Sequence, residues 1–592
     1  MSLKETLVDL EEQFDKVKKL IDNSNSDPET APYTSKYAAR EHLQSMNTLL
    51  DKVKSQNEAN DILHNKIIGM LGAIQLQLGT IALETEELSL SDKHYDECLE
   101  IINGHTLTVE VASVCLNLYM QLGILWGRRH YAKGLVYLSQ AEDFCKQLKE
   151  INMIPIDYSD YFKNDFTFNE EEAKEKLEKA YTLILFYIAQ AYASSNPLKS
   201  AVYCHQTLQR QFDSKDYEHI DWALNTATLS QFFMVRNGFK QAKHHLSAAL
   251  FMFDEYKKMV DASVDEGEEY EAKLETYRHR LGDVSRCWIK YALNLLTNSK
   301  ERLINTENIE LTACTCTDLA EMDLSEFEVT KEDMSKMIFQ NMDVSEYDSR
   351  VGHHFLLTMD DAKKVFHFAQ SFVNSAIEYH TLNTHASDYV EIMQDYSRLY
   401  DVLAFYAEDP DVRCKIYKRS ADILEDLQSA INPQYYMRYC RQNWYHLGST
   451  YSDMLDIKLE KLSGTSRPTQ HEMTKVNTLV EKTVANFTKF IDSFRNASGD
   501  LPSKISDGGE KVFLLAYFHI AAKQTKYATS DRVVLADRIQ KSIDAYKALL
   551  AYCKANPDAG ELIPAELQLA DMMVKLLQLK IARINNVAPP PI

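Results

Sequence analysis

Two consecutive stretches between residues 181 and 253 constrain the fold of this chain more than any other feature. Each has the pattern of a helical hairpin, in which small and large side chains recur at fixed spacing. In the second hairpin these positions are Ser230, Phe233, Ala242, Leu246 and Ala249. In the first hairpin they are Ala189, Tyr192, Ala201, His205 and Leu208. Small residues let two antiparallel helices approach closely and large ones fill the space beside them, so the spacing predicts paired helices.

The same spacing recurs along the rest of the chain. It is found around Gly79, around Gly123 and, most completely, in Trp444-x2-Leu447-Gly448-x2-Tyr451. This is the spacing of tetratricopeptide repeats, here with longer helices and loops than a strict repeat has. Each such repeat buries its apolar face against its neighbours. We therefore expect an all-α solenoid of degenerate tetratricopeptide-like helix pairs.

Composition favours this fold class and limits the kinds of partner. Glycine (17) and proline (13) together make up about 5% of the 592 residues, against roughly 12% in an average protein. The net charge of −22 disfavours nucleic acid and anionic membranes as main partners and suits a basic protein surface. No run of 18 apolar residues occurs, so we expect no membrane insertion. The acidic N-terminus and the absence of C-x-x-C predict a reduced, cytoplasmic protein.

Shifts in pattern divide the chain into four parts. These are an N-terminal helix and linker (1–35), a first repeat block (36–260), linking helices with an acidic loop (261–350) and a second repeat block (351–592). Residues 3–21 carry a heptad seam, which is compatible with a coiled-coil dimer or with packing on the same chain. Its shortness favours the second alternative, and therefore a monomer. The acidic block 317–349 is either a solvated loop or a recognition tail, and its charge density favours the loop.

No motif for catalysis or for a cofactor occurs in the sequence. A Walker loop, a G-x-G-x-x-G after a strand, a nucleophile elbow and an H-E-x-x-H are all absent. Cys314-x-Cys316 lacks further zinc ligands, so we interpret it as a reduced loop. The pairs His244-His245 and His353-His354 are interpreted as partly exposed helix residues, because adjacent helical side chains diverge. We therefore expect no enzymatic activity, no cofactor and no metal.

The first helix of each pair in a solenoid lines a concave face, where a peptide or a partner helix commonly binds. The side chains expected to face this groove are Tyr187, Gln190, Asn225, Thr228 and Gln231. Their side-chain amides recur at matching positions, which favours recognition over an ordinary polar surface. Other positions expected to point inward are Leu76, Thr80, Met120, Ile124 and Phe186, and none of these carries positive charge.

Longer strings carry a resemblance that is more specific than repeat spacing. They include FYIAQAY, DWALNTATLSQFF, AKHHLSAA, YVEIMQDYSRLYDVLAFYAEDPDVRCKIYKRSADILEDL and INPQYYMRYCRQNWYHLGSTYSDMLDIKLEKL. Similar strings near the N-terminus are TSKYAAREHLQSM and QLGILWGRRHYAKGLVYLSQAED. Across nearly the full chain, the sequence resembles the KIF-binding protein family. The acidic middle segment and the loops match poorly, so loop contacts are not carried over.

The resemblance implies a right-handed α-solenoid in two halves joined by a linking helix. It also implies a cytoplasmic, cytoskeleton-associated protein that binds the motor domains of a subset of kinesins and keeps them off microtubules. The motor's microtubule-binding helix is then held in the concave face, and Tyr187, Gln190 and Thr228 fall on matching strings. Two alternatives stay open. One is a co-chaperone-like adaptor that clamps a peptide carboxylate, which requires Lys or Arg in the groove. The other is a scaffold unrelated to motors.

Overall fold

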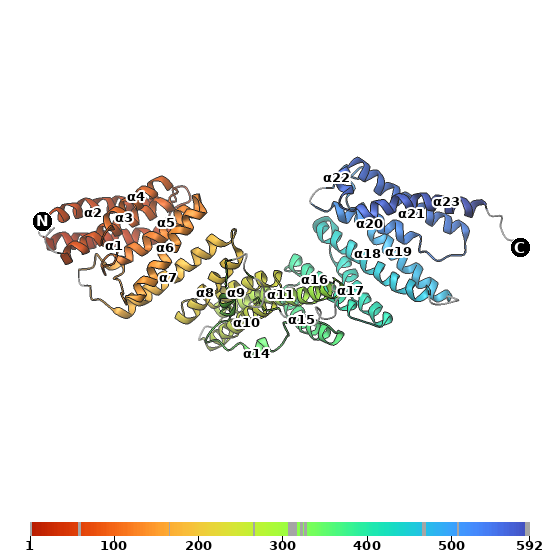
Figure 1. Ribbon diagram of the computed structural model, residues 1–592, viewed down its shortest axis with the longest axis horizontal. Helices are drawn as coiled ribbons and strands as arrows, with labels where there is room; N and C mark the ends of the chain where they lie inside the picture. The colour runs from red at the N-terminus through yellow and green to blue at the C-terminus, as the bar shows by residue number, and fades with distance from the viewer. Residues whose placement is uncertain are drawn as a thin grey trace. The chain divides into compact units, whose positions relative to one another are not determined.

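The computed structural model describes residues 3–56, 61–164, 166–263, 267–305, 317–319, 324, 328–463, 469–505 and 508–586. Within these residues the chain is helical and has no β-strand, and neighbouring helices pack in pairs (Figure 1). The predicted fold class is therefore confirmed. The chain forms two compact units: unit 1 is Met1–Glu218 with Ala320–Met342, and unit 2 is His219–Leu319 with Asp343–Ile592. The four-part division predicted from the sequence stays a prediction.

Unit 1 is built from four helix pairs followed by a short returning segment. The pairs are α1 (Leu3–Asn23) with α2 (Thr34–Gln56), α3 (Asp61–Glu84) with α4 (Leu88–Ile102), α5 (Ala112–Arg129) with α6 (Tyr131–Glu150), and α7 (Glu170–Tyr192) with α8 (Pro197–Ser214). The segment that returns to unit 1 contains α13 (Lys331–Ser335). A single apolar core runs through the pairs.

The predicted glycine anchors are the points where these helices touch. A Cβ atom on Gly79 would lie 2.3 Å from the ring of the buried Tyr95, and one on Gly123 would lie 2.5 Å from Leu138. Real Cβ atoms do not approach other atoms so closely, so only glycine fits at these two positions. The small-residue spacing thus sets the distance between the paired helices.

Two features of unit 1 bear on the sequence predictions. The seam of α1 buries Leu10, Phe14 and Val17, and Phe14 stacks on Phe162 of the same unit at 4.2 Å between ring centroids. The seam therefore packs on its own chain, as its length had favoured. Among the described helices, Leu63–Glu84 within α3 is long and apolar enough to cross a membrane, but most of it is buried inside unit 1. Burial of this kind is typical of a core helix.

Unit 2 continues the pairing. Its paired helices are α9 (His219–Val235) with α10 (Phe239–Ala262), α11 (Glu268–Asn305) with α15 (Met359–Tyr379), α16 (Ala386–Phe405) with α17 (Pro410–Ala430), α18 (Pro433–Ser463) with α19 (Gln470–Asp492), and α20 (Glu510–Gln524) with α21 (Arg532–Ala555). The shorter α14 (Ser345–Asp348) and α22 (Pro557–Gly560) lie between them in sequence, and the last helix, α23 (Pro564–Asn586), packs on α21. The predicted anchors of the α9–α10 hairpin, Ser230, Phe233, Ala242, Leu246 and Ala249, are all buried.

The histidine pairs differ from the prediction. His244 and His245 are both buried, because α10 is covered by α9, by α11 and by the segment made of α14 and the residues that follow it. The Lys243 ammonium donates to the carbonyl oxygens of Asp348 and Val351 in that segment, at 2.9 and 3.3 Å. Burial lowers the pKa of His244 to about 4, so it is neutral at physiological pH. His353 and His354 lie outside the helices altogether.

The acidic block is also not the solvated loop that its charge suggested. In its described part, Met334, Met337 and Phe339 are buried in unit 1, and Val344 and Tyr347 are buried in unit 2. Backbone contacts fix the first stretch: His205 Nε2 donates to the Lys336 carbonyl (3.1 Å), and the Gln340 N–H donates to the Gln209 side chain (2.7 Å). Most of its described acidic side chains are exposed while the apolar ones pack inward, but Asp318 is largely buried and accepts from Lys240 and Gln241. Cys314-x-Cys316 lies outside the described residues.

Candidate functional site: exposed faces of the first helices

Helix α7 presents an apolar and amide-bearing face to solvent. Tyr187 and Gln190, which the sequence had singled out, lie on it together with Leu183 and Phe186, each of which is 42% exposed. We call these four residues the α7 patch. Their spacing of three and four residues places them on one face, while the opposite face, represented by Ile184 and Ile188, is buried in the core.

The α7 patch is held firmly by its surroundings. The Asn169 side chain caps the start of α7 by accepting the backbone N–H groups of Glu171 and Glu172, at 3.1 and 3.4 Å. The rings of Phe186 and Tyr187 meet edge to face at 5.5 Å, and Tyr187 is half-buried against the unit 1 core. Tyrosine is among the residue types enriched in protein-binding hot spots, and Tyr187 lies here beside the exposed apolar side chains of Leu183 and Phe186.

Helix α9 of unit 2 presents a polar face. Asn225, Thr228 and Gln231 are all exposed and follow one another at three-residue spacing, which places them on one side of the helix. We call these three residues the α9 patch. The other side of α9 is buried and includes Trp222 and Phe233. The Thr228 hydroxyl donates to the Leu224 carbonyl (2.8 Å), and the Gln231 amide lies 3.5 Å from the Cys287 sulfur.

The five predicted site residues are therefore surface residues, two on unit 1 and three on unit 2. That they line one groove stays a prediction. Leu76 and Met120, which the sequence had placed among the inward-facing positions, are buried, so that expectation was wrong for them. Their helices α3 and α5 are covered on more sides than an isolated hairpin would be, and such residues become core. Thr80 and Ile124 are half-buried, and Phe186 is exposed.

Sequence reasoning missed a row of carboxylates on α16 and α18 of unit 2. On α16, Asp388 and Glu391 both accept from Arg286 of α11, at 2.6 Å each. Asp395 pairs with Lys290 of α11 at 2.5 Å. Asp388, Glu391 and Asp395 recur at three- and four-residue spacing on one face of α16, and this spacing is the signal that could have identified them.

Asp453 on α18 is the carboxylate of this row with the most perturbed acidity. Partial desolvation raises the pKa of Asp453 to about 6, and the nearby carboxylates of Asp401 and Asp456 add to the increase. The side chain is still exposed to solvent, and Asp401 itself is engaged by His446. A cationic partner group placed beside Asp453 would favour its charged form and so gain affinity as the pH rises through 6.

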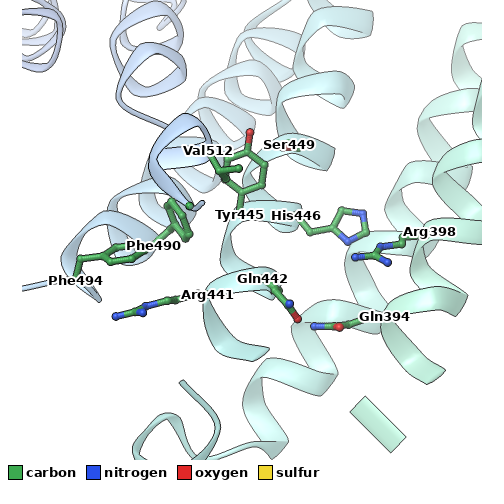
Figure 2. Close-up of a pocket in the computed structure, with 11 residues that line it drawn as sticks. Gln394, Arg398, Arg441, Gln442, Tyr445, His446, Ser449, Phe490, Phe494 and Val512 are labelled. Carbon is green, nitrogen blue, oxygen red and sulfur yellow. The ribbon is translucent and has the colours of Figure 1, made fainter. Parts of the chain in front are cut away.

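A pocket of about 360 Å³ lies beside this row, between α16, α18, α19 and α20 (Figure 2). Phe490, Phe494 and Val512 form its apolar side, and Gln394, Arg398, Gln442 and His446 form its polar side. The Arg441 guanidinium lies 3.9 Å from the Phe494 ring centroid and donates to the Ser493 carbonyl at 2.6 Å. The pocket is large enough for one partner side chain, and its mixed lining suits an amphipathic one.

Within the described residues, no group of three or more His, Cys, Asp or Glu side chains is placed to bind a metal ion. The described cysteines are unpaired, and most are buried. Burial raises the pKa of Cys115 to about 12, which leaves its thiol protonated and unreactive at neutral pH. The apolar α7 patch, the amides of the α9 patch, the carboxylate row and the mixed lining of the pocket offer contact groups to another protein.

Comparison with known proteins agrees with such a role. The family model described as "KIF-1 binding protein C terminal" matches residues 220–584. The "KIF-binding protein" of Danio rerio is 33% identical over 611 residues, covering 95% of each chain, and that of Drosophila melanogaster is 32% identical, covering 98% of each. The "KIF-binding protein" of Homo sapiens is 31% identical, covering 95% of each chain.

A solved structure shows that the similarity extends to the fold. "Kinesin binding protein (KBP)" aligns with a TM-score of 0.62 and 27% sequence identity, over 96% of this chain and 98% of that one. The repeat spacing, the paired helices and the near full-length match to several relatives all lead to one assignment. This chain belongs to the KIF-binding protein family.

Proposed function

We propose that this protein is a non-enzymatic regulator that binds the motor domains of a subset of kinesins and blocks their attachment to microtubules. The observation that carries the proposal is the match to proteins named as KIF-binding proteins over 95% or more of both chains. A function that depends on the whole solenoid is expected to be shared among relatives that share the whole solenoid. The protein then acts in the cytoplasm, in association with the cytoskeleton.

Electrostatics supports competition as the mechanism. A kinesin meets acidic tubulin through a basic surface, and this chain has a net charge of −22. Asp388 and Glu391 on α16 share the single cation Arg286, so one negative charge is left over there, and Asp453 on α18 adds another; both helices come first in their pairs. A protein that offers the motor a field similar to that of tubulin competes for the same surface.

The α7 and α9 patches supply the short-range part of the proposed contact. Leu183 and Phe186 are exposed apolar side chains that a partner helix would cover, and Tyr187 is a preorganised aromatic anchor beside them. Asn225 and Gln231 offer amide groups that can donate and accept hydrogen bonds. We propose that each patch contacts the motor domain and that the motor's microtubule-binding helix lies against the α7 patch. The α7 patch contains no Lys or Arg, which disfavours a clamp for a peptide carboxylate.

Direct titration of purified kinesin motor domains with this chain tests whether the binding exists. We expect saturable binding for a subset of motors, with an affinity that falls as salt is raised because the attraction is partly electrostatic. Affinity should also fall as the pH is lowered through about 6, because Asp453 then takes up a proton and loses its negative charge.

The Asp453→Asn variant is the control for the pH effect, since it is already neutral at pH 7 and should show a flatter profile across this range. Equal affinities at pH 7.5 and pH 5.5 in the unmodified chain, to about twofold, would remove Asp453 from the contact. If no motor domain from a broad kinesin panel bound the chain, the proposed function would be wrong.

A further inference from the structure

The last helix, α23, exposes an apolar stripe that nothing in the described chain covers. Its members are Leu569 (44% exposed), Met572 (58%), Leu576 (59%) and Leu579 (65%). The opposite face of α23 buries Ala570 and Leu577 in the core that it shares with α21. Figure 1 shows α23 beside α21. The helix is therefore apolar on two sides, of which only one has a partner among the described residues of unit 2.

Such a stripe is unusual at the end of a stack of helix pairs. The terminal element of a solenoid normally carries a polar outer face, because no further repeat covers it. The spacing within the stripe is three, four and three residues, which is the a and d pattern of a coiled coil over about two heptads. A stripe with this pattern is complementary to another helix of the same kind.

We propose that α23 pairs antiparallel with α23 of a second copy of this chain, forming a two-fold symmetric dimer. The flanking charges favour this orientation. Glu566 and Lys580 occupy equivalent heptad positions 14 residues apart on the same side of the stripe. Antiparallel pairing brings Glu566 of each copy beside Lys580 of the other, and symmetry repeats the contact twice. The same arrangement brings the two Lys575 side chains near the two-fold axis, where each is paired with Asp571 of its own helix. Parallel pairing would instead place Lys575 of each copy beside Lys580 of the other, which makes two like-charge contacts and no opposite-charge one.

The ion pairs within the described residues leave this contact available. Lys575 is already paired with Asp571 of its own helix at 2.6 Å, whereas neither Glu566 nor Lys580 has an ion pair among the described residues. Because α23 is already folded against α21, dimerisation does not require the helix to form first. Four side chains per copy make a small interface, below the roughly 1,200 Å² of a standard one, so we expect a weak dimer with a micromolar Kd.

This dimer departs from the monomer that the sequence predicted. That prediction rested on the seam of α1, which is indeed buried in unit 1. The α23 stripe was not recognised in the sequence, because apolar residues recur on both sides of this helix. The α7 and α9 patches contain no residue of α23, so the inference does not depend on the proposed motor binding.

Sedimentation of the full chain between about 1 and 100 µM tests the proposal across the affinity range expected for a small interface. The unmodified chain should shift from monomer to dimer over this range. Leu576→Glu should remain monomeric throughout, since it places a carboxylate from each copy in the apolar seam. Gln578→Glu, an exposed change on the same helix but outside the stripe, should dimerise normally. A chain that stays monomeric at the highest concentration, or a Leu576→Glu variant that still dimerises, overturns the proposal.

Charge exchange tests the orientation and separates self-association from binding to another protein's helix. Glu566→Lys alone and Lys580→Glu alone each create two like-charge contacts and should weaken the dimer about tenfold or more. Mixing the two single variants should restore association, because the heterodimer regains opposite-charge contacts in place of two like-charge ones. Single variants that dimerise like the unmodified chain, or mixtures that fail to recover, contradict antiparallel pairing.

Discussion

Replacement of Gly448 by leucine is expected to unfold unit 2 at temperatures where the unmodified chain is stable. A Cβ atom at this position would lie 2.9 Å from three atoms of the Phe487 ring. Phe487 is fully buried and is itself held between Tyr445 and His519, at 5.4 and 5.3 Å between ring centroids, so it has little room to move. Overpacking of such a contact typically costs about 1–3 kcal/mol and sometimes more.

Thermal melting followed by circular dichroism measures this effect. Gly127→Leu is the matched control, because Gly127 is also helical but a Cβ atom there meets nothing within 4 Å. The control should melt like the unmodified chain or slightly above it, since leucine has a higher helix propensity than glycine. A melting curve unchanged by Gly448→Leu would show that α18 and α19 do not pack through this glycine.

The double substitution Tyr187→Ala with Gln190→Ala is expected to weaken motor binding about tenfold or more, chiefly by speeding dissociation. Both side chains belong to the α7 patch, where a partner helix would exclude water from them. Surface plasmon resonance with one motor domain at physiological salt gives both rate constants. Normal dissociation from the double variant would exclude the α7 patch from the interface.

The chain supplies a control of identical chemistry. Tyr137 and Gln140 have the same residue types at the same spacing on α6, with Tyr137 half-buried and Gln140 exposed, as in the α7 pair. Tyr137→Ala with Gln140→Ala should therefore perturb unit 1 to a similar degree without affecting motor binding, because α6 is the second helix of its pair. Equal losses in the two variants would attribute the effect to folding.

Whether the acidic block contacts the motor is tested by substitution and not by deletion, because a deletion would remove its buried methionines and so disturb the core. Glu332→Gln with Glu346→Gln removes two exposed charges that are paired only within their own short segments. Since charges separated by more than about 8 Å are screened at 0.15 M salt, this variant should associate more slowly only at low salt. A large loss of affinity at physiological salt would instead place the acidic block in the interface.

Helix pairing was predictable from the sequence because its cause is local. Gly79, Gly123 and Gly448 each sit where two consecutive helices touch, and the residue that each one accommodates is less than 50 positions away. Because this steric requirement acts between helices that are neighbours in sequence, it produces a regular spacing of small residues that is recognisable in the sequence. The composition added the remaining constraint, since so few glycines and prolines leave little turn-forming sequence.

Burial imposed by distant segments was not predictable. His244 and His245 are buried because α11 and residues more than 90 positions away cover α10 in addition to its partner α9, and the periodicity of α10 alone does not indicate this. The prediction that the acidic block is a solvated loop was wrong for a related reason. Its charged residues dominate the composition, while Met334, Met337 and Phe339 are spaced so as to pack against unit 1.

For the candidate site, the sequence predicted which positions are exposed but not the electrostatic properties of the site. Asn225, Thr228 and Gln231 are exposed on one helix face, as their three-residue spacing on a helix predicts. The raised pKa of Asp453 was not predictable, because it depends first on desolvation by the surrounding helices and then on the carboxylate of Asp401 from a different helix. Pairwise electrostatics between helices requires the packing to be known first.

Competition for the motor is the central claim, and microtubule co-sedimentation tests it most directly. A kinesin motor domain held on microtubules by a non-hydrolysable nucleotide should move from the pellet to the supernatant as this protein is added. Excess microtubules should return it to the pellet. Tyr187→Ala with Gln190→Ala should require about tenfold more protein for the same release. If motor, microtubule and this protein instead pelleted together as a ternary complex, the protein would bind kinesin without blocking its attachment, and competition would be contradicted.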